Sequence, residues 1–276
     1  MPRLLDSPAT GFSISLFGAP GSWKTSLMRS LPPDSTRYIE IEGGSTPLRR
    51  YGWNADFACP RRPDKKNPNV FKNDLDDSLN FLRFQQHSIK YCVLDSATEI
   101  EKYFQIALAY AAGKDITSLH EYGGASDLTY KALVEFRDLK FPECTATKVP
   151  VNTIFLCGEF PLEITRTQDS VISVIYPMLT RKMAVKIAHL LDVLARLEIR
   201  GLTDRFLRFQ PTDSIACKSR FDLQNMSVSA DFNFYTSVIL PIEEASRTNV
   251  HTAAHPATPT PPAANKSPAQ KLGRLS

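Results

Sequence analysis

Short apolar runs alternate with amphipathic stretches along most of the chain. Where apolar positions alternate with polar ones, or run together before a glycine or a polar cluster, they predict strands, at residues 12–17, 38–42, 89–94, 151–157 and 171–176. Where apolar positions recur every three or four residues they predict helices, at residues 24–30, 74–86, 98–112, 126–140 and 182–191. Residues 45–73, rich in Pro, Asn and Arg, predict a long loop, and short strands are expected from residue 191 to about residue 240.

This alternation predicts an α/β fold with a mainly parallel sheet and helices on both of its faces. From about Glu244 the composition changes to Ala, Pro, Thr, Ser and Asn, which offer too little apolar surface to offset the entropy of ordering. We therefore expect one domain at residues 1–243 and a disordered tail at residues 244–276. The tail is either an inert solubilising segment or a tether for DNA or a partner protein.

Composition narrows the class of protein. Of the 276 residues, 42% are hydrophobic and 22% charged, as in soluble globular proteins, and the net charge of +4 permits a nucleic-acid partner without arguing for one. The five cysteines form no CxxC pair, which argues against a zinc site, and Cys92 and Cys157 lie in apolar runs that predict buried thiols of a reducing compartment. The chain begins without the apolar core of a signal peptide, and no apolar run approaches the ~20 residues that span a bilayer. A cytoplasmic protein with no membrane contact is expected.

A phosphate-binding loop is predicted between the strand that ends at Phe17 and the helix that begins at Lys24. The consensus GxxxxGK[ST] uses small residues so that backbone N–H groups converge on phosphate oxygens at a helix N-terminus. Lys24 is expected to contact the β- and γ-phosphates of ATP, and the Thr25 hydroxyl is expected to ligate Mg²⁺. The predicted nucleotide-binding residues are Gly18, Ala19, Pro20, Gly21, Ser22, Trp23, Lys24, Thr25 and Ser26.

Trp23 departs from this consensus, because it stands where the last glycine belongs. A side chain is acceptable there only if the backbone dihedrals suit an L-residue and the indole points away from the phosphates. The alternative is a chance match on an ordinary strand–turn–helix.

Two acidic positions are expected to complete a site for nucleotide hydrolysis. Asp95 ends an apolar strand and is predicted to hold Mg²⁺ through water, with the Ser96 hydroxyl in the same shell; the alternative is an aspartate that caps the strand. Glu42 is predicted at the end of the strand 38–42, on one face with Glu40, and is the preferred base that deprotonates water, with Glu40 the weaker candidate. The alternative for this pair is exposed charges on an edge strand.

The order of these motifs, over about residues 11–240, resembles the RecA-like P-loop ATPase core. It is most similar to the compact bacteriophage nucleotide-binding family that includes single-strand-annealing recombinases without the accessory domains of RecA. The resemblance rests on residues 15–21, 38–44, 93–96, 176–179 and 191–194. It implies the same role of catalytic base for Glu42. Thr180-Arg181 stand where relatives often have Pro-Gly, so the turn there departs from the pattern.

The resemblance also assigns roles to later residues. Residues 216–220 look like the basic pair that contacts the nucleotide of the next subunit, which would make Lys218 and Arg220 catalytic in trans; a spacing of two on a strand would place both on one face. Glu159 corresponds to the residue that senses the γ-phosphate. The segment 160–182, with Arg166, Arg181 and Lys182, lies where such proteins have a DNA-binding loop. The basic and aromatic residues of 45–73 suit single-stranded DNA, although an ordinary surface loop fits them equally well.

The function implied is a DNA-stimulated ATPase of phage recombination that uses ATP and Mg²⁺. It would act on single-stranded DNA as a homo-oligomeric ring or filament, with a single-strand-binding protein as a candidate partner. The alternative is a nucleotide-gated accessory or loader of DNA replication with little turnover. A metabolic kinase is disfavoured, because no signature of a lid or a second substrate is present.

Overall fold

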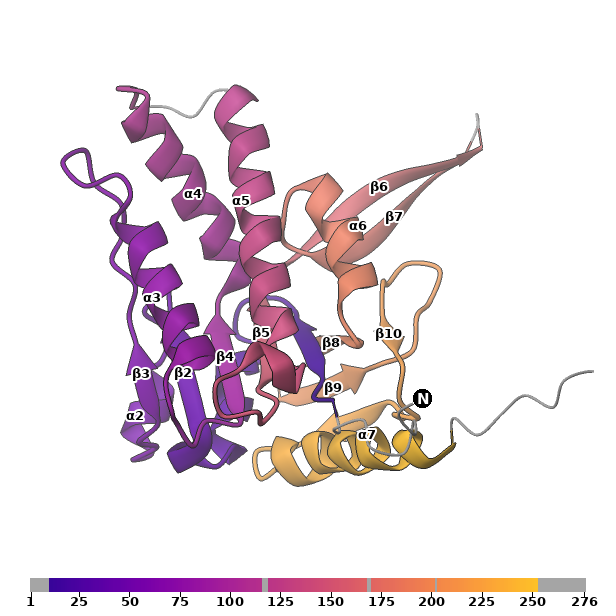
Figure 1. Cartoon of the computed structure of the whole chain (residues 1–276). Coiled ribbons are helices and arrows are strands. Elements are labelled where there is room, and N and C mark those ends of the chain that lie inside the picture. Colours follow the sequence, from indigo (N-terminus) through magenta and orange to yellow (C-terminus); the bar gives the residue numbers. More distant parts are fainter. Residues whose placement is uncertain (1–9, 116–118, 168–169, 202, 253–276) are drawn as a thin grey trace, which may run out of the picture.

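A mixed sheet forms the centre of the computed structural model, which describes residues 10–115, 119–167, 170–201 and 203–252 (Figure 1). Its strands are β1 (Ser13–Phe17), β2 (Thr36–Glu40), β3 (Asp56–Ala58), β4 (Tyr91–Asp95), β5 (Asn152–Cys157), β8 (Val193–Arg200), β9 (Asp204–Arg208), β10 (Lys218–Ser219) and β11 (Met226–Val228). They follow the order β11-β9-β8-β1-β5-β4-β2-β3, and β10 pairs with the beginning of β8.

The six strands from β8 to β3 run parallel, and β9, β10 and β11 extend this core in antiparallel fashion. β1 lies in the middle, where Ile14 faces Ile154 of β5 on one side and Val193 of β8 on the other. Parallel neighbours need long crossover connections, and helices in those connections cover the faces of the sheet. The predicted α/β class with a mainly parallel sheet flanked by helices is confirmed.

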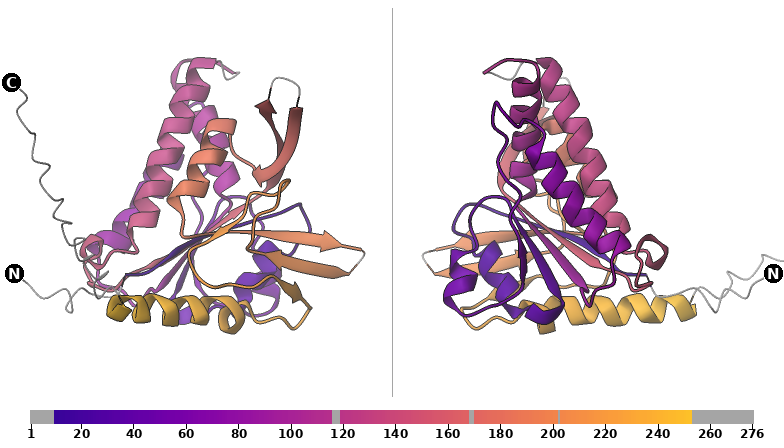
Figure 2. Two further views of the ribbon diagram at one scale, coloured as in Figure 1. Left: turned by 90° about the vertical axis from the view of Figure 1, so that its right-hand side faces the viewer. Right: turned by 60° about the vertical axis from the view of Figure 1, so that its left-hand side comes forward.

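The two faces of the sheet carry two separate hydrophobic cores. One core lies under α3 (Val70–Phe84), α4 (Ala97–Ala111), α5 (Leu119–Asp138) and α6 (Arg181–Leu190). The other lies under α1 (Lys24–Leu27), α2 (Thr46–Arg50) and α7 (Leu240–Thr252). Figures 1 and 2 show α7 across the sheet from α5 and α6. Cys92 and Cys157 are buried free thiols, as predicted.

A two-stranded hairpin projects from this body beside α6 (Figures 1 and 2). It consists of β6 (Glu159–Thr167) and β7 (Ser170–Pro177), and β6 follows directly after β5. The strand predicted at residues 171–176 is therefore one arm of an antiparallel pair.

Two predictions about loops are wrong. Residues 45–73 contain α2, β3 and the first turn of α3, because Leu48 and Trp53 anchor this segment in the core. The tail does not begin at residue 244, because α7 continues to Thr252. Ile242 is fully buried, and Glu243 accepts hydrogen bonds from the Tyr91 hydroxyl at 2.5 Å and from the Asn152 amide at 3.3 Å. Residues 253–276 of the predicted tail lie outside the described residues.

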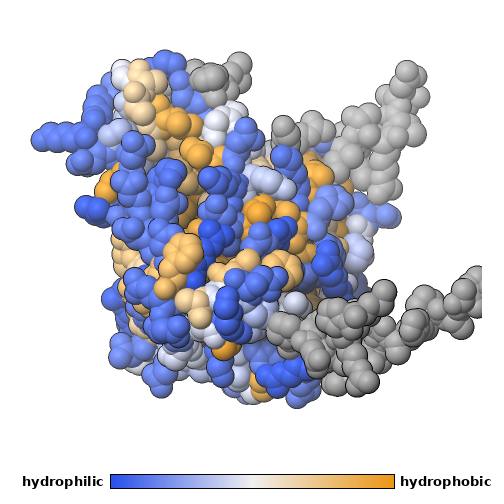
Figure 3. Space-filling model, in the orientation of Figure 1, coloured by the Kyte–Doolittle hydropathy of each residue, from blue (hydrophilic) through white to orange (hydrophobic). Residues whose placement is uncertain are grey.

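The surface shown in Figure 3 is mainly hydrophilic, with smaller hydrophobic areas between the polar side chains. Within the described ranges, no helix has both the length and the apolar character needed to cross a bilayer.

Candidate functional site

The loop of residues 18–23 follows β1 at the carboxyl edge of the parallel sheet, where β2, β4 and β5 also end. The Gly18 amide donates to the carbonyl of Cys157 at 3.3 Å. A Cβ atom at Gly18 would lie 2.4 Å from the carbonyl oxygen of Leu197 in β8, so only glycine fits here. The loop is thus held tightly between β5 and β8.

The Lys24 side chain turns back into this loop. Its Nζ donates to the carbonyls of Gly18 at 2.7 Å and Ala19 at 3.0 Å, and to the Ser22 hydroxyl at 3.2 Å. Burial lowers the pKa of Lys24, while the nearby Asp95 carboxylate opposes that shift. The loop therefore surrounds a partly desolvated cation.

A side chain at position 23 needs backbone dihedrals that suit an L-residue and an indole that points away from the loop. Trp23 meets only the second of these conditions. Its φ of 75° lies in the left-handed region, so the backbone takes the conformation that favours glycine. Its indole lies outside the loop, under Arg205, whose Cζ is 4.6 Å from the ring centre. The expected contact of the indole with a neighbouring subunit or a nucleotide stays a prediction.

Arg205 of β9 is a site residue that no sequence signal identified. Its Nη2 donates to the carbonyl of Gly21 at 3.2 Å, while its guanidinium covers Trp23. The residue is only 9% exposed, and it makes no ion pair with a carboxylate in the part of the chain that the structure describes. Its buried Nε also has no hydrogen-bond partner there. Arg205 therefore connects the loop of residues 18–23 to β9 through a hydrogen bond and a cation–π contact.

Asp95 contacts Thr25 at the end of β4. The Thr25 hydroxyl donates to Asp95 Oδ2 at 2.7 Å, and the hydroxyl of the fully buried Tyr38 donates to the same oxygen. Burial raises the pKa of Asp95, although these two hydrogen bonds and the charge of Lys24 oppose the rise. Sequence reasoning missed Tyr38, because a tyrosine in an apolar strand has no mark that separates it from other core aromatic residues.

Glu42 lies beyond β2, which ends at Glu40, so its predicted position at the strand's end is wrong by two residues. The amides of Ile41 and Glu42 both donate to the carbonyl of Asp95, at 2.7 and 3.2 Å, and this turns the chain toward Asp95. The Glu42 side chain reaches solvent, yet the protein atoms around it and the Asp95 carboxylate raise its pKa. A carboxylate with a raised pKa at this edge has the chemistry of a general base.

Glu40, the weaker candidate, is already engaged with α2. It accepts hydrogen bonds from the Ser45 amide at 2.9 Å and from Arg49 at 3.3 Å. Burial of Glu40 acts to raise its pKa, but these contacts outweigh it and hold the pKa below its usual range. The predicted common face of Glu40 and Glu42 is not formed, because the strand ends between them.

Oxygen ligands for a cation gather around Thr25 and Asp95. The buried Ser96 hydroxyl lies close enough to the Glu42 carboxylate to oppose the rise in its pKa, although it meets no partner at full hydrogen-bond geometry among the described residues. Within the same residues, no cluster of three or more His, Cys, Asp or Glu side chains is present. A hydroxyl, a carboxylate and an unused hydroxyl fit Mg²⁺, which retains several waters, better than a cation that needs a cage of protein ligands.

Glu159 lies at the same edge, directly after β5. It pairs with Arg196 of β8 through two contacts, at 2.8 and 3.2 Å. Arg196 is opposite Phe17 in register, so the pair flanks the loop of residues 18–23. The side chains of Arg166, Arg181 and Lys182, predicted for DNA, lie outside the described residues.

Lys218 and Arg220 lie at the opposite, amino edge of the sheet. Lys218 Nζ donates to the carbonyls that end α6, including Leu191 at 2.8 Å, and Arg220 pairs with Asp192 at 2.9 Å. β10 spans only Lys218–Ser219, so the predicted common strand face for both residues is wrong. Neither cation meets Lys24 or Asp95 within one chain, and their contact with a nucleotide of a second copy stays a prediction.

A cavity of about 210 Å³ adjoins the loop on the α1 side, lined by Trp23, Ser26, Leu27, Arg29, Tyr51, Ser229, Ala230 and Phe232. Arg29 donates to the carbonyl of Ala230 at 2.6 Å and lies over the Tyr51 ring, which is 69% exposed. Elsewhere in the segment 45–73, Trp53 is buried and Arg61 is paired with Asp74 at 2.8 Å. Buried side chains such as Leu48 and Trp53 therefore anchor the segment, while most of its residues, the arginines included, are exposed.

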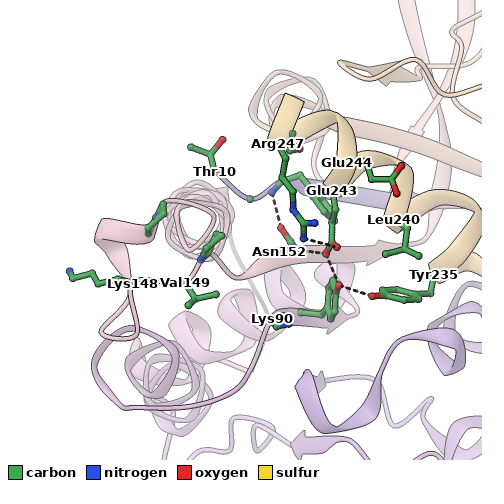
Figure 4. A pocket seen from close by; sticks show the side chains of 16 residues that line it. Thr10, Lys90, Lys148, Val149, Asn152, Tyr235, Leu240, Glu243, Glu244 and Arg247 are labelled. Carbon is green, nitrogen blue, oxygen red and sulfur yellow. Dashed lines mark hydrogen bonds and ion pairs between the residues drawn. The ribbon is translucent and has the colours of Figure 1, made fainter. Parts of the chain in front are cut away.

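A second cavity, of about 540 Å³, lies at the amino edge of the sheet between α7 and the starts of β4 and β5 (Figure 4). Glu243 and Asn152 point toward each other there. The Tyr91 hydroxyl also donates to Glu243. None of the residues expected to bind a nucleotide lines it.

No protein-family model and no curated protein sequence matches this chain.

Proposed function

We propose that the chain is an ATP-binding and ATP-hydrolysing protein with a RecA-like P-loop core. The observation that carries the proposal is the arrangement at the end of β1, where the Lys24 ammonium lies inside the loop of residues 18–23 and Thr25 donates to Asp95 beside it. This combination of a caged cation, a hydroxyl and a buried carboxylate suits a triphosphate with its metal ion.

Lys24 would bind the phosphates by exchanging partners. The carbonyls of Gly18 and Ala19 now accept its hydrogen bonds, and phosphate oxygens carry more negative charge than carbonyls. Burial makes the interaction stronger, because a desolvated cation is weakly screened.

Thr25 and Asp95 are the residues that would hold Mg²⁺, with Tyr38 keeping the Asp95 carboxylate in place. Bound Mg²⁺ would neutralise charge that develops on the phosphates. Glu42 would take a proton from the attacking water, a role that its raised pKa and its access to solvent favour.

The cavity beside α1 is the site that we assign to the base of the nucleotide. Trp23, Tyr51 and Phe232 give it aromatic surfaces, and the Ser26 hydroxyl and Arg29 give it polar groups. Flat aromatic rings at this position suit a purine.

The broader role follows from the resemblance. We propose action on single-stranded DNA by a homo-oligomer, with Lys218 and Arg220 serving the nucleotide of a neighbouring copy. The second candidate is a nucleotide-gated accessory of replication with little turnover, and turnover measurements separate the two.

Isothermal titration and steady-state hydrolysis of Mg²⁺-ATP test the proposal. We expect Lys24→Ala to weaken ATP binding by about tenfold or more, and Glu42→Gln to retain binding while kcat falls by about 100-fold or more. Lys90→Ala removes an exposed lysine at the opposite edge and serves as the matched control.

The proposal is wrong if the wild-type protein binds no ATP, or if Lys24→Ala binds it as well as wild type does. Tight binding without turnover, in the presence and absence of single-stranded DNA, would favour the second candidate.

A further inference from the structure

A basic hollow of about 390 Å³ opens between α5, α6 and the chain after β10, at the amino edge of the sheet. It is lined by Tyr130, Arg137, Lys140, Phe141, Lys186, His189, Leu190 and Arg220. Four of these side chains carry permanent positive charge and none is a carboxylate. The two helices come from distant parts of the sequence and lie side by side (Figures 1 and 2).

The positive charge of the hollow is only partly compensated. Arg137 pairs with Asp138, while Lys140 and Arg220 share the single carboxylate of Asp192. Lys186 makes no ion pair with a described carboxylate, and its Nζ lies 4.5 Å from the centre of the Tyr130 ring. Two carboxylates thus face four cations.

Lys218 lies next to the hollow and adds to its excess of positive charge. Burial lowers its pKa, the positive charges of Arg220 and Lys140 lower it further, and the Asp192 carboxylate opposes this shift. Its Nζ donates to carbonyls at the end of α6 and makes no direct ion pair with a carboxylate of the described residues. Mutual repulsion of this kind is relieved when an anion binds.

Aromatic surface accompanies the charge. Tyr130 and Phe141 are half-buried, and both line the same hollow as the four cations. Cations spaced along a groove bind successive phosphates, and rings between them stack on bases of any sequence. Anionic lipid headgroups would also meet the charge, but a recessed cavity with aromatic walls suits a single flexible strand better than the plane of a bilayer.

We propose that this hollow binds the backbone of a single-stranded nucleic acid, with Tyr130 and Phe141 stacking on its bases. The proposal rests on the proposed function for the identity of the partner, and it gives that partner a site at the edge of the sheet opposite the ATP site. Bound strand and bound nucleotide of one copy would then lie on opposite edges of the same β-strands.

Fluorescence anisotropy of labelled oligo(dT), about 20 nucleotides long and titrated over a range of salt concentrations without nucleotide, tests the site. The test variant carries Arg137→Gln and Lys186→Gln, both at side chains that reach the surface. We expect its affinity to fall about tenfold or more, and the slope of log K against log salt to shrink by about 1.4, because two phosphate contacts are lost. The matched control carries Lys102→Gln and Lys131→Gln, which remove the same charge from exposed positions of α4 and α5, and should bind within about twofold of wild type.

A second arm separates a nucleic-acid site from a general polyanion site. Tyr130→Leu should weaken oligo(dT) binding by about fivefold or more and leave the affinity for inorganic polyphosphate unchanged. The proposal is overturned if the Arg137/Lys186 variant binds oligo(dT) like wild type, or if Tyr130→Leu has no effect on it. Binding to phosphatidylserine vesicles without binding to oligo(dT) would also overturn it. Because the assay contains no nucleotide, its results can be interpreted even if the protein binds no ATP.

Discussion

Trp23 and Arg205 form one contact from parts of the chain that are far apart in sequence. A left-handed backbone costs a non-glycine residue about 1–2 kcal/mol. The guanidinium over the indole contributes about 0.5–2 kcal/mol in the opposite direction, and the hydrogen bond from Arg205 to Gly21 fixes the turn. At the scale of single residues, the loop therefore keeps a glycine-like conformation without the glycine.

A double-mutant cycle tests this pairing. Arg205→Gln should weaken ATP binding in the wild-type loop, and the loss should be much smaller in Trp23→Gly, because glycine needs no support at φ 75°. We expect a coupling free energy of about 1 kcal/mol between the two positions, measured from ATP dissociation constants. Arg208→Gln, on the same strand but paired with Glu198, should combine additively with Trp23→Gly.

Asp95 carries a predictable pH dependence. Its native pKa is raised above the value of about 3.9 in unfolded chains, so the native state binds this proton more tightly. The ionised carboxylate therefore costs stability at neutral pH, and that cost disappears as pH falls through the raised pKa.

We expect Asp95→Asn to unfold about 2–4 °C higher than wild type at pH 8 and to lose Mg²⁺-dependent hydrolysis. Thermal unfolding measured across pH should show the melting temperatures of Asp95→Asn and wild type converging as the solution is acidified. Asp76→Asn changes an exposed carboxylate and should follow wild type throughout. A difference in melting temperature that widens as pH falls would contradict a raised pKa for Asp95.

At the scale of elements, Asp192 joins the amino end of the sheet. It precedes β8 and accepts hydrogen bonds from the Ser13 amide at 2.9 Å in β1, from Lys140 at 2.7 Å after α5, and from Arg220 at 2.9 Å. Burial acts to raise the pKa of Asp192, but Lys140 and Ser13 outweigh it and hold that pKa below its usual range.

Asp192→Ala should lower the free energy of unfolding by about 3–5 kcal/mol, because it leaves the Lys140 charge buried without a partner. Chemical denaturation at pH 7 measures the change, with the exposed Asp222→Ala as control. A lowered native pKa means that this stabilisation is present above about pH 4 and is lost as pH falls through the native value. A deficit that stays constant down to acid pH would contradict this.

The strength of local patterns explains which elements the sequence predicts. The strands β1, β2, β4 and β5 and the helices α3 to α6 were predicted because each buries several regularly spaced apolar residues. α2 is a single short turn anchored by Leu48, and β3 has only three residues, so neither provides enough positions for a period. α7 was not predicted, because the chain was expected to form short strands to about residue 240 and a tail from residue 244. The hydrogen bonds of Glu243 that hold this helix leave no periodic apolar signal in the sequence.

Local patterns also decide which residues of the site could be predicted from the sequence. Lys24, Thr25 and Asp95 could be predicted because a contiguous motif and a strand end mark them. Tyr38 and Arg205 act across neighbouring strands, and the pairing of β2 with β4 and the position of β9 behind the loop exist only in the folded chain.

At the scale of the whole molecule, α7 closes the face of the sheet opposite α5 and α6 (Figure 2). A chain that ends at residue 239 should therefore melt at a clearly lower temperature than one that ends at residue 252, because it loses Ile242 and Glu243. Calorimetry of the two truncations, which differ only in the helix, measures its contribution. Equal melting temperatures would show that α7 does not stabilise the fold.

The central position of β1 has a consequence for how the protein is made. β1 leaves the ribosome first, yet its two partners are residues 152–157 and 193–200. The apolar segment from Phe12 to Phe17 stays unpaired until both partner strands have been synthesised. Contacts between residues so far apart in sequence make folding slow. This apolar segment is thus open to aggregation until β5 and β8 have emerged, and chaperones that bind short apolar segments have a natural target there.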